Sequence, residues 1–388
     1  MHSKRKLCVV TGTRAEYGLL KHLIAAIDSA EEFELILLVT GSHLSQKFGH
    51  TFQEIEGDGF LINKKINLNI NGDSSDHIAK STALSIEGFS EAYGELAPDL
   101  IIILGDRYEL LGAAISAMYH QIPIAHLHGG EVTLGAMDES IRHSLTKLSH
   151  LHFVANDEYG NRVKQLGENP SHVFNVGGLG VDAIKRIQLM PKSQLEDSLQ
   201  MQFREKNLLV TFHPVTLENS TSAKQMGELL KALLLRSDSQ IIFTMPNADP
   251  DSKILFRMIE DFVSTNSNSC LFTSLGQTRY FSCLAQVDAV IGNSSSGLHE
   301  VPSFKKATIN IGDRQKGRLK AESVIDCGSD FESINNAITK LYTSSFQKIV
   351  STSTNPYGEG GAVDLIINYL KKQSFDNLLK KNFYDLKL

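Results

Sequence analysis

Short apolar runs alternate with amphipathic stretches of helical period along almost the whole chain. The run Ile101-Ile102-Ile103-Leu104 shows the type, because four aliphatic residues follow one another with no polar residue between them. Such a run is typical of a strand buried on both faces, in a parallel sheet that helices cover on each side. We therefore expect an α/β fold built from doubly wound parallel sheets.

The same rhythm occurs twice, which predicts two doubly wound halves with a seam in the polar stretch around 186–206. In the first half the expected strands are 6–13, 33–41, 61–69, 99–105, 122–127 and 151–155, with helices near 17–30, 77–96, 107–120 and 138–149. In the second half they are 207–213, 240–245, 270–274, 288–292, 306–311 and 323–326, with helices near 221–236, 251–265, 277–286, 295–303 and 331–343.

Composition narrows the choice of partner and compartment. The 388 residues carry a formal net charge of −6, so no basic excess points to nucleic acid. Cys8, Cys270, Cys283 and Cys327 lack the CxxC spacing of a zinc site and are expected to be reduced thiols. The apolar run behind MHSKRK is too short for a signal peptide or a membrane span. We expect a cytoplasmic protein without a membrane partner.

Polar residues cluster where the expected strands end, which is where open parallel sheets bind their ligands. Two sheets facing each other across a cleft would bring these residues to opposite walls of one site. The residues are Gly12-Thr13-Arg14, Gly105-Asp106-Arg107, the segment His126 to Glu131, His213-Pro214, Pro246-Asn247, Gly292-Asn293-Ser294-Ser295-Ser296-Gly297 and Gly312-Asp313-Arg314.

The stretch GNSSSGLHE is the clearest anion signal. A Gly/Ser-rich turn that opens a helix offers backbone N–H groups, hydroxyls and the positive end of a helix dipole, which suit a diphosphate. We expect Ser294 and Ser295 to contact it, Arg314 to add a bidentate cation, and Glu300 to bind a ribose diol. The alternative is an ordinary serine-rich N-cap with a solvated glutamate.

Arg14 follows the first expected strand where a dinucleotide site would show GxGxxG. Because those glycines are absent, a guanidinium that reaches the phosphates is more plausible than close backbone contact. The alternative is a surface arginine paired with Glu16.

Asp106, Glu131 and Asp138 follow successive elements, and Arg142 lies four residues after Asp138 on the same helix face. Carboxylates gathered in a partly dry site acquire different proton affinities, so one acts as acid while another acts as base. The alternative is structural: a helix salt bridge between Asp138 and Arg142, and a capping pair of Asp106 with Arg107. His126-Leu127-His128 lacks a third ligand at metal spacing, so no metal is expected.

Seven motifs together resemble one family, the hydrolysing UDP-N-acetylglucosamine 2-epimerases, in particular the bacterial NeuC-type enzymes of sialic-acid synthesis. The motifs are VTGTRAEYGLL, LGDRYE, HLHGGE, DESIRHSLTKLSHLHF, FHPVT, IGNSSSGLHEVPS and INIGDRQKGR.

The resemblance implies a GT-B fold of two Rossmann-like domains with the active site in the cleft between them. Residues 1–185, joined by a returning helix at 365–388, would do the sugar chemistry, and 186–364 would bind UDP. It also implies loss of UDP and of the hydrogen on sugar carbon 2 to give a 2-acetamidoglucal, then addition of water to release N-acetylmannosamine, without a cofactor. A homodimer or homotetramer is expected.

Residue by residue, the resemblance makes Asp106, Glu131 and Asp138 the acid and base candidates, with Arg142 orienting them or contacting the sugar. The residues expected to contact the diphosphate are Arg14, Ser294, Ser295, Arg314 and His213. His213 is expected to take part in catalysis as well. Glu300 would bind the ribose, and Arg107 and Asn247 would make further contacts with the substrate.

The chain departs from related epimerases in one position. Many place a glutamate two residues after the first histidine, where this chain has His128, so we expect Glu131 to carry the role with His128 as its partner. Three alternatives stay open: a 2,4-diacetamido-trideoxy sugar nucleotide of the legionaminic-acid pathway as substrate, a non-hydrolysing epimerase, or a GT-B glycosyltransferase or sugar-nucleotide sensor.

Overall fold

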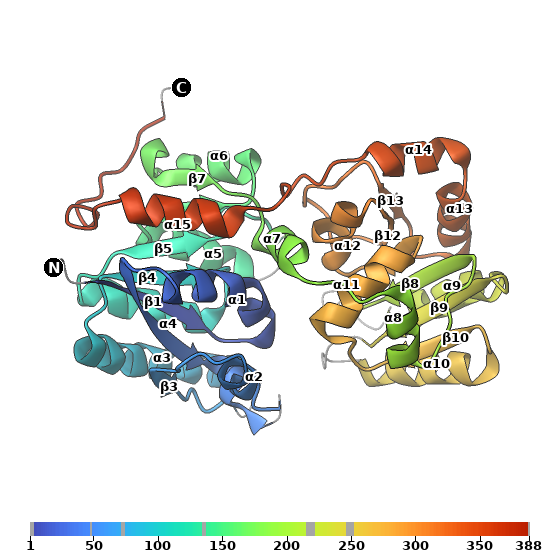
Figure 1. The fold of residues 1–388 in the computed structure, drawn as a ribbon, viewed down its shortest axis with the longest axis horizontal. Coiled ribbons are helices and arrows are strands. Elements are labelled where there is room, and N and C mark those ends of the chain that lie inside the picture. The colour runs from blue at the N-terminus through green and yellow to red at the C-terminus, as the bar shows by residue number, and fades with distance from the viewer. Residues whose placement is uncertain are drawn as a thin grey trace. The chain divides into compact units, whose positions relative to one another are not determined.

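The computed structural model describes residues 4–46, 49–70, 74–133, 137–214, 222–245 and 252–386. The chain divides into two compact units, Met1–Ala183 with Gly360–Leu388 and Ile184–Glu359. Figure 1 shows that each unit has strands at its centre and helices on the outside. All strand pairs in both sheets are parallel. The predicted fold class of two doubly wound parallel sheets is confirmed.

The first unit holds a seven-stranded sheet of order β3-β2-β1-β4-β5-β6-β7. Its strands are β1 (Arg5–Thr11), β2 (Phe33–Thr40), β3 (Lys64–Ile66), β4 (Leu100–Leu104), β5 (Ile124–Leu127), β6 (Leu151–Val154) and β7 (Val173–Asn175). Its helices are α1 (Arg14–Asp28), α2 (Phe52–Gly57), α3 (Ser75–Leu96), α4 (Tyr108–Tyr119), α5 (Met137–Leu148), α6 (Asp157–Gln165), α7 (Leu179–Arg186), which ends past the unit boundary, and α15 (Ala362–Lys372), with 3₁₀ turns η1 (Gly41–Leu44) and η3 (Pro170–His172).

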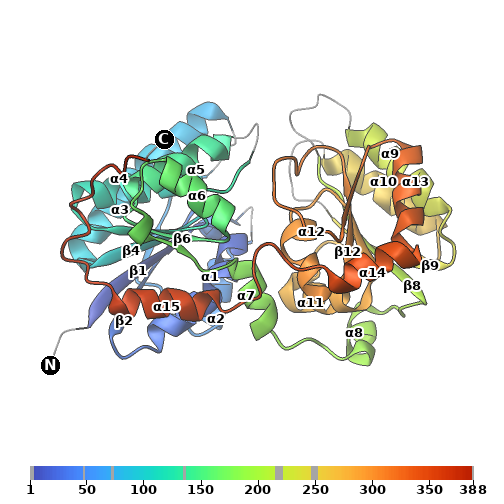
Figure 2. The same ribbon diagram turned by 90° about the horizontal axis from the view of Figure 1, so that it is seen from above.

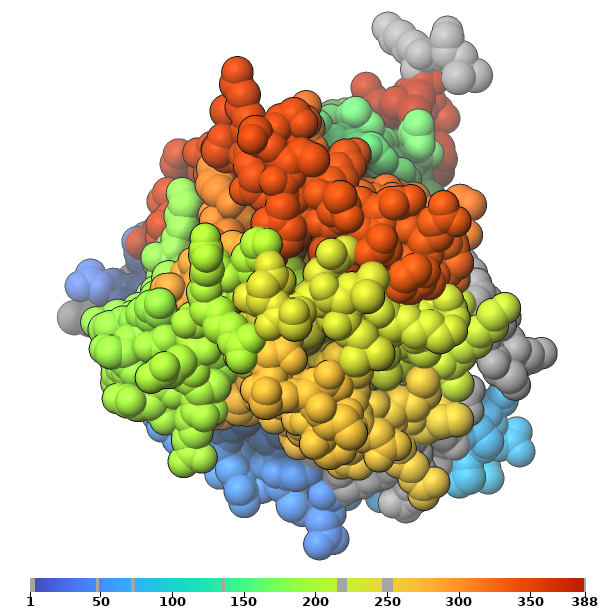
Figure 3. Space-filling view, turned by 90° about the vertical axis from the view of Figure 1, so that its right-hand side faces the viewer, coloured from blue at the N-terminus to red at the C-terminus, as the bar shows by residue number. Residues whose placement is uncertain are grey.

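The second unit holds a six-stranded sheet of order β10-β9-β8-β11-β12-β13. Its strands are β8 (Lys206–Thr211), β9 (Ser239–Thr244), β10 (Ser269–Phe272), β11 (Ala289–Gly292), β12 (Ala307–Ile311) and β13 (Val324–Cys327). Its helices are α8 (Lys192–Leu199), α9 (Ser222–Leu234), α10 (Ser252–Thr265), α11 (Gly276–Gln286), α12 (Ser296–His299), α13 (Phe331–Leu341) and α14 (Ser344–Thr352), with the 3₁₀ turn η4 (Val301–Phe304). Figure 3 views this unit from a side on which α9, α10, α13 and α14 lie outermost.

Alternate residues of β1 pack on opposite faces of the first sheet, as the two-residue period of a strand requires. Leu7 and Val9 belong to a core shared with α1 and α15, whereas Cys8 and Val10 belong to a core shared with α3 and α4. The helix α15 lies beside α1, although more than 300 residues separate them in the chain (Figures 1 and 2). The apolar runs of the sequence therefore become strands buried on both faces.

Three expected elements differ from the structure. The returning helix expected at 365–388 is α15, which ends at Lys372 and is followed by non-helical chain through 373–386. The strand expected at 61–69 is reduced to β3, a three-residue edge strand in which only Ile66 is buried. The helix expected at 295–303 is a single turn, α12, followed by η4, because Pro302 has no N–H to continue an α-helical ladder. The strand β7 was not expected and completes the edge of the first sheet. No helix within the described ranges is long and apolar enough to cross a membrane.

Candidate active site

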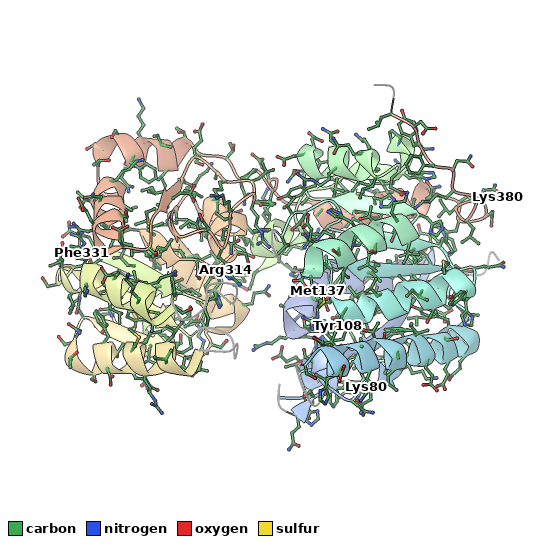
Figure 4. All side chains as sticks on the ribbon, turned by 180° about the vertical axis from the view of Figure 1, so that it is seen from behind. Lys80, Tyr108, Met137, Arg314, Phe331 and Lys380 are labelled. Carbon is green, nitrogen blue, oxygen red and sulfur yellow. The ribbon has the colours of Figure 1, made fainter. Side chains whose placement is uncertain are left out.

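Each sheet reverses its strand order once, and ligands of open α/β sheets bind outside the carboxyl ends of the strands at that reversal. In the first unit the reversal lies between β1 and β4, and in the second it lies between β8 and β11. Figure 4 labels Tyr108 and Met137, the first residues of the neighbouring helices α4 and α5, and Arg314 in the second unit.

Asp106 follows β4 and pairs with Arg142 of α5. The Arg142 guanidinium donates one hydrogen bond to the Asp106 carboxylate and a second, of 3.0 Å, to the Thr133 hydroxyl. Arg142 is 5% exposed, whereas the side chain of its partner Asp106 is 20% exposed, so a buried guanidinium meets a carboxylate that is still partly open to solvent. The backbone before Asp106 is fixed as well, because His126 Nε2 donates to the Gly105 carbonyl at 2.7 Å. Burial lowers the pKa of His126 to about 3, so this imidazole stays neutral.

Glu131 and His128 follow β5 and form a hydrogen-bonded pair. His128 Nδ1 lies 2.8 Å from Glu131 Oε1, and the Leu179 N–H donates to His128 Nε2 at 3.3 Å. Since Nε2 accepts, the proton of a neutral His128 sits on Nδ1 and is donated to the carboxylate. His128 holds this position in a left-handed backbone conformation, with φ of 61°. The expected partnership of the two side chains is present in the structure.

Asp138 lies half-buried in the first turn of α5. The alternative of a helix salt bridge from Asp138 to Arg142 is wrong, because Arg142 pairs with Asp106. The proposed capping pair of Asp106 with Arg107 is wrong too, because the Arg107 Nε contacts Glu109 Oε1 at 2.6 Å. Arg142 and Arg107 therefore each form a salt bridge with a carboxylate that is not the nearest acidic residue in the sequence.

Arg14 opens α1 and is paired with Glu54 at 3.0 Å on the surface, with about half of each side chain exposed. Its alternative pairing with Glu16 is wrong. The Glu16 carboxylate instead accepts hydrogen bonds from the N–H groups of Gly12 and Thr13, and Thr13 caps α1 in return. This reciprocal capping box fixes the turn between β1 and α1.

In the second unit, His213 and Asn293 join the ends of β8 and β11. The His213 N–H donates to Asn293 Oδ1 at 2.7 Å, and Asn293 Nδ2 donates to the His213 carbonyl at 2.8 Å. Arg314 Nη1 and Gln315 Nε2 both donate to the Asn293 carbonyl at 2.9 Å. Burial, with a smaller contribution from the Arg314 charge, lowers the pKa of His213 to about 4. A neutral histidine and a guanidinium therefore lie around one asparagine.

The segment from Ser294 to Glu300 differs from the expected long helix. Ser295 occupies the N-cap position of the one-turn α12 without a side-chain capping bond, so it is not the ordinary serine cap of the alternative reading. Such a short helix has a smaller dipole than expected, since the dipole grows with the number of aligned peptides. Glu300 is half-buried, and desolvation of its carboxyl group raises its pKa, against a smaller opposing effect of a hydrogen bond with Ser296. Asn247 lies outside the described residues.

Comparisons with known proteins identify the family of the chain. A family model described as UDP-N-acetylglucosamine 2-epimerase matches residues 25–371. The chain belongs to this family. It is 42% identical to the GDP/UDP-N,N'-diacetylbacillosamine 2-epimerase (hydrolyzing) of Campylobacter jejuni, over 99% of this chain and 100% of that protein. It is 39% identical to the polysialic acid biosynthesis protein P7 of Escherichia coli, over 98% of each.

The fold also matches that of the UDP-GlcNAc 2-epimerase of Neisseria meningitidis, solved with UDP-GlcNAc bound. The TM-score is 0.82 with 19% identity, over 95% of this chain and 100% of that one. This likeness confirms the GT-B class of two Rossmann-like domains. As a member of the epimerase family, the chain is a UDP-sugar 2-epimerase.

Sequence reasoning missed several residues around the family motifs. Glu109 is fully buried and Glu16 is 8% exposed, and both approach the turn at Gly12. Asn293, which joins β8 to β11, was quoted only as part of a glycine-rich turn. The Thr-x-x-Glu spacing of a capping box was available for Glu16, but nothing local to Glu109 signals its burial. No group of three or more potential metal ligands occurs among the described residues.

Proposed function

We propose that the chain is a hydrolysing 2-epimerase of a UDP-linked 2-acetamido sugar. The first unit would act on the sugar through Asp106, Glu131 and Asp138, and the second would hold UDP. The observation that carries the proposal is the arrangement around Asp106. A buried arginine keeps one carboxylate charged at the end of β4, while a second carboxylate with a histidine partner follows the next strand.

The reaction divides into an elimination and an addition. A base removes the hydrogen on carbon 2 while the bond from carbon 1 to the diphosphate oxygen breaks, which leaves a 2-acetamidoglucal and UDP. Water then adds its hydroxyl to carbon 1, and carbon 2 receives a proton on the opposite face, so the free 2-epimer is released. Because the hydrogen on carbon 2 is only weakly acidic, cleavage at carbon 1 must lead and build oxocarbenium character.

The residues described above have the properties that these steps need. Asp106 accepts a hydrogen bond from the Arg142 guanidinium and suits a base, and Glu131 with His128 suits the group that returns or relays a proton. Asp138 remains a third candidate at the start of α5. The roles are proposals based on these contacts and on the family motifs.

The second unit offers neutral and cationic donors for the leaving diphosphate. We propose that Arg314, Ser294, Ser295 and a neutral His213 contact its oxygens, and that Glu300 accepts from the ribose. Charge-assisted contacts of this kind are stronger than neutral ones and stabilise negative charge as it develops. In the first unit Arg14 and Arg107 are the proposed additional cations, although each already has a carboxylate partner. We also propose that Asn247 contacts the substrate and that the protein assembles as a homodimer or homotetramer.

Two sugar nucleotides compete as substrate. The name of the Campylobacter relative favours UDP-N,N'-diacetylbacillosamine, a 2,4-diacetamido-trideoxyglucose, which would feed legionaminic-acid synthesis. The name of the Escherichia relative favours UDP-N-acetylglucosamine, giving N-acetylmannosamine for sialic-acid synthesis. Since the first relative is the more similar of these two and is named as hydrolysing, we place its substrate first and keep the other as the second candidate.

Proton NMR in deuterated water with either sugar nucleotide tests the proposal. Free 2-epimer with deuterium at carbon 2, together with UDP, is the expected outcome, and the faster substrate identifies the sugar. A UDP-linked epimer would make the enzyme non-hydrolysing. Binding without turnover of either compound would favour a glycosyltransferase or a sensor. Glu131→Gln should stop turnover while UDP still binds, and Arg314→Ala should weaken UDP binding in calorimetry.

A further inference from the structure

Two buried glutamates meet at the reversal point of the first sheet. Glu16 is on α1, which follows β1, and Glu109 is on α4, which follows β4. The Gly12 N–H donates to Glu16 Oε2 at 2.7 Å, and a Cβ placed on Gly12 would lie only 2.5 Å from Glu109 Oε1. Both carboxyl groups therefore approach the same glycine. We call Glu16 and Glu109 the carboxyl pair.

A second glycine, Gly41, lies against both Gly12 and the Glu109 carboxyl group. Gly41 has φ of 62°, and a Cβ there would lie 2.6 Å from the Gly12 carbonyl oxygen and 2.9 Å from Glu109 Oε1. No other residue type fits both contacts and the left-handed backbone. The backbone that follows β1 and the backbone that follows β2 therefore both pack closely against Glu109, and little room remains there for water.

The charges around the carboxyl pair do not balance if both glutamates are ionised. Arg107 Nε contacts Glu109 at 2.6 Å and supplies one positive charge. His43, which faces the same turn from η1, is hydrogen-bonded through both ring nitrogens to Thr11 and Thr51. Burial lowers the pKa of His43 to about 4, so it adds no charge near neutral pH.

The hydrogen bonds leave two oxygens of the pair without a donor. Glu16 Oε1 and Glu109 Oε2 are buried and have no partner among the described residues. A proton held on one of the two carboxyl groups provides a donor and removes the excess negative charge, as in other sites where two carboxyl groups share one proton. Burial, and then the charge of Glu109, raise the pKa of Glu16 to about 8.

We propose that Glu109 is a positioning residue for the epimerase reaction, and that the carboxyl pair holds one proton so that Arg107 stays fixed beside Asp106 at the end of β4. The inference rests on the proposed function, because Asp106 is its acid or base. Arg107 is the residue next to Asp106 and the N-cap of α4, so the Glu109 contact sets the start of that helix. When the proton is lost, a second buried negative charge appears near Asp106 and the positive charge of Arg107 is divided between two carboxylates.

Tyr108 is a further titratable group close to the pair. It lies between Arg107 and Glu109 in sequence, and burial, followed by the Glu109 charge, raises its pKa above its ordinary value. Tyr108 therefore stays neutral over the range in which the carboxyl pair would lose its proton. Around the pair, among the described residues, lie Arg107 at the N-cap of α4, Tyr108 on α4 and His43 on η1, with Asp106 next to Arg107; Arg107 carries the positive charge of this group.

The test is the pH profile of kcat for the wild-type protein and for Glu16→Gln and Glu109→Gln. The wild-type kcat should fall above pH about 8, by roughly tenfold per pH unit, as the pair loses its proton. Glu16→Gln keeps an uncharged hydrogen-bonding group and should move this fall upward by at least about one pH unit. Glu109→Gln removes the carboxylate partner of Arg107 and should lower kcat by roughly tenfold or more at every pH.

The control is Glu56→Gln, which removes an exposed glutamate of α2 that pairs with Lys65 and should leave the profile unchanged. An alkaline fall that stays in place in Glu16→Gln, or a wild-type kcat in Glu109→Gln, would overturn the inference.

An infrared titration provides a measurement that does not depend on activity or on the folding of Glu109→Gln. The absorption of a protonated carboxyl group should persist in the wild-type protein at pH 7, disappear as pH rises past about 8, and be absent in Glu16→Gln. Its absence in the wild-type protein would reject the shared proton. If neither sugar nucleotide is turned over but this absorption is present, the proposed function fails while the protonated pair stands.

Discussion

The Arg142 side chain links helix α5 to the segment that follows β4 and to the segment that follows β5. Its guanidinium on α5 donates to Asp106 after β4 and to Thr133 after β5, and the lysine amine cannot present two donors in this planar arrangement. We expect Arg142→Lys to lower kcat by roughly tenfold or more. Arg142→Ala leaves the Asp106 carboxylate without its partner and should lower the free energy of unfolding by about 3 kcal/mol in urea titrations.

A matched control for Arg142→Ala is Lys64→Ala, which removes a pair with Glu95 that is largely exposed on the glutamate side. Such surface pairs contribute about 0–1 kcal/mol, so the control should unfold almost as the wild type does. Equal losses of stability in the two variants would show that the contact of the buried Arg142 with Asp106 stabilises the protein no more than a surface pair does.

At single positions, the strand end that a residue follows was predictable from the sequence, whereas the partner of its side chain was not. Asp106 and Glu131 could be placed together because both follow neighbouring parallel strands. The partner of Arg142 could not be placed, because a helix offers Asp138 four residues away and only the tertiary fold brings Asp106 within reach. Glu109 was missed for a related reason: a glutamate in the first turn of a helix is ordinarily exposed.

At the level of elements, the C-terminal segment is tied to the end of α5. The Lys381 amine donates to the carbonyls of Lys147 and Ser149 at 2.7 and 2.6 Å and contacts Glu168 at 2.8 Å. These contacts satisfy carbonyl groups at the last turn of the helix that carries Arg142. Although burial opposes it, hydrogen bonds from His152, Lys147 and Lys381 lower the pKa of Glu168 to about 2.

We expect Lys381→Ala to loosen the end of α5. Amide hydrogen exchange over 145–152 should become at least roughly tenfold faster, because the helix end loses its donor and Glu168 loses one of its cations. Lys380→Ala is the matched control, since the neighbouring lysine is exposed and should not change exchange there. Equal exchange in Lys381→Ala and the wild-type protein would show that the segment does not stabilise this helix.

Element boundaries were predictable where local chemistry sets them. The buried strand β4 was expected from its aliphatic run. The helix expected at 17–30 begins three residues earlier, at Arg14, because the Thr13 and Glu16 capping box sets its start. The short α12 was mispredicted because an apolar spacing continues through Pro302, and only the missing N–H ends the ladder. The strand β7 has no long apolar run, and its place depends on pairing with β6.

At the level of the whole molecule, two sheets were predictable because two series of apolar runs need two sets of covering helices. The return of α15 to the first unit followed only from the family resemblance. Its apolar residues Val363, Ile366 and Leu370 have the period of any amphipathic helix. The sequence of this segment does not show which of the two cores they pack into, and in the structure it is the core of the first unit.

The stability of the whole chain should depend on pH through its buried histidines. Burial lowers the pKa of His43, His150 and His213 to about 4 and that of His126 to about 3. In the unfolded chain each histidine has a pKa of about 6.5, so below that pH the unfolded state binds protons that the folded state does not. Each such group then lowers the free energy of unfolding by up to about 1.4 kcal/mol per pH unit, between pH about 6.5 and about 4.

Glu16 acts with the opposite sign, because its raised pKa makes the folded state bind the extra proton. Its contribution is present at low pH and is lost as pH rises from about 4.5 to about 8. Four histidines outweigh one glutamate below pH 6.5, so urea titrations should give a steep loss of stability from pH 6.5 to 5. A free energy of unfolding that stays constant over this range would contradict the buried neutral state of the histidines.

His150→Asn tests the assignment at one position. Its Nδ1 accepts the Ile124 N–H at 3.1 Å, and the Asn Oδ1 can replace that acceptor without a titrating group. The slope of stability against pH should therefore become smaller by up to about 1.4 kcal/mol per pH unit below pH 6.5. The exposed His77 provides the control, since His77→Asn should keep the wild-type slope. If both variants kept the full slope, the acid sensitivity would have to arise from groups other than His150.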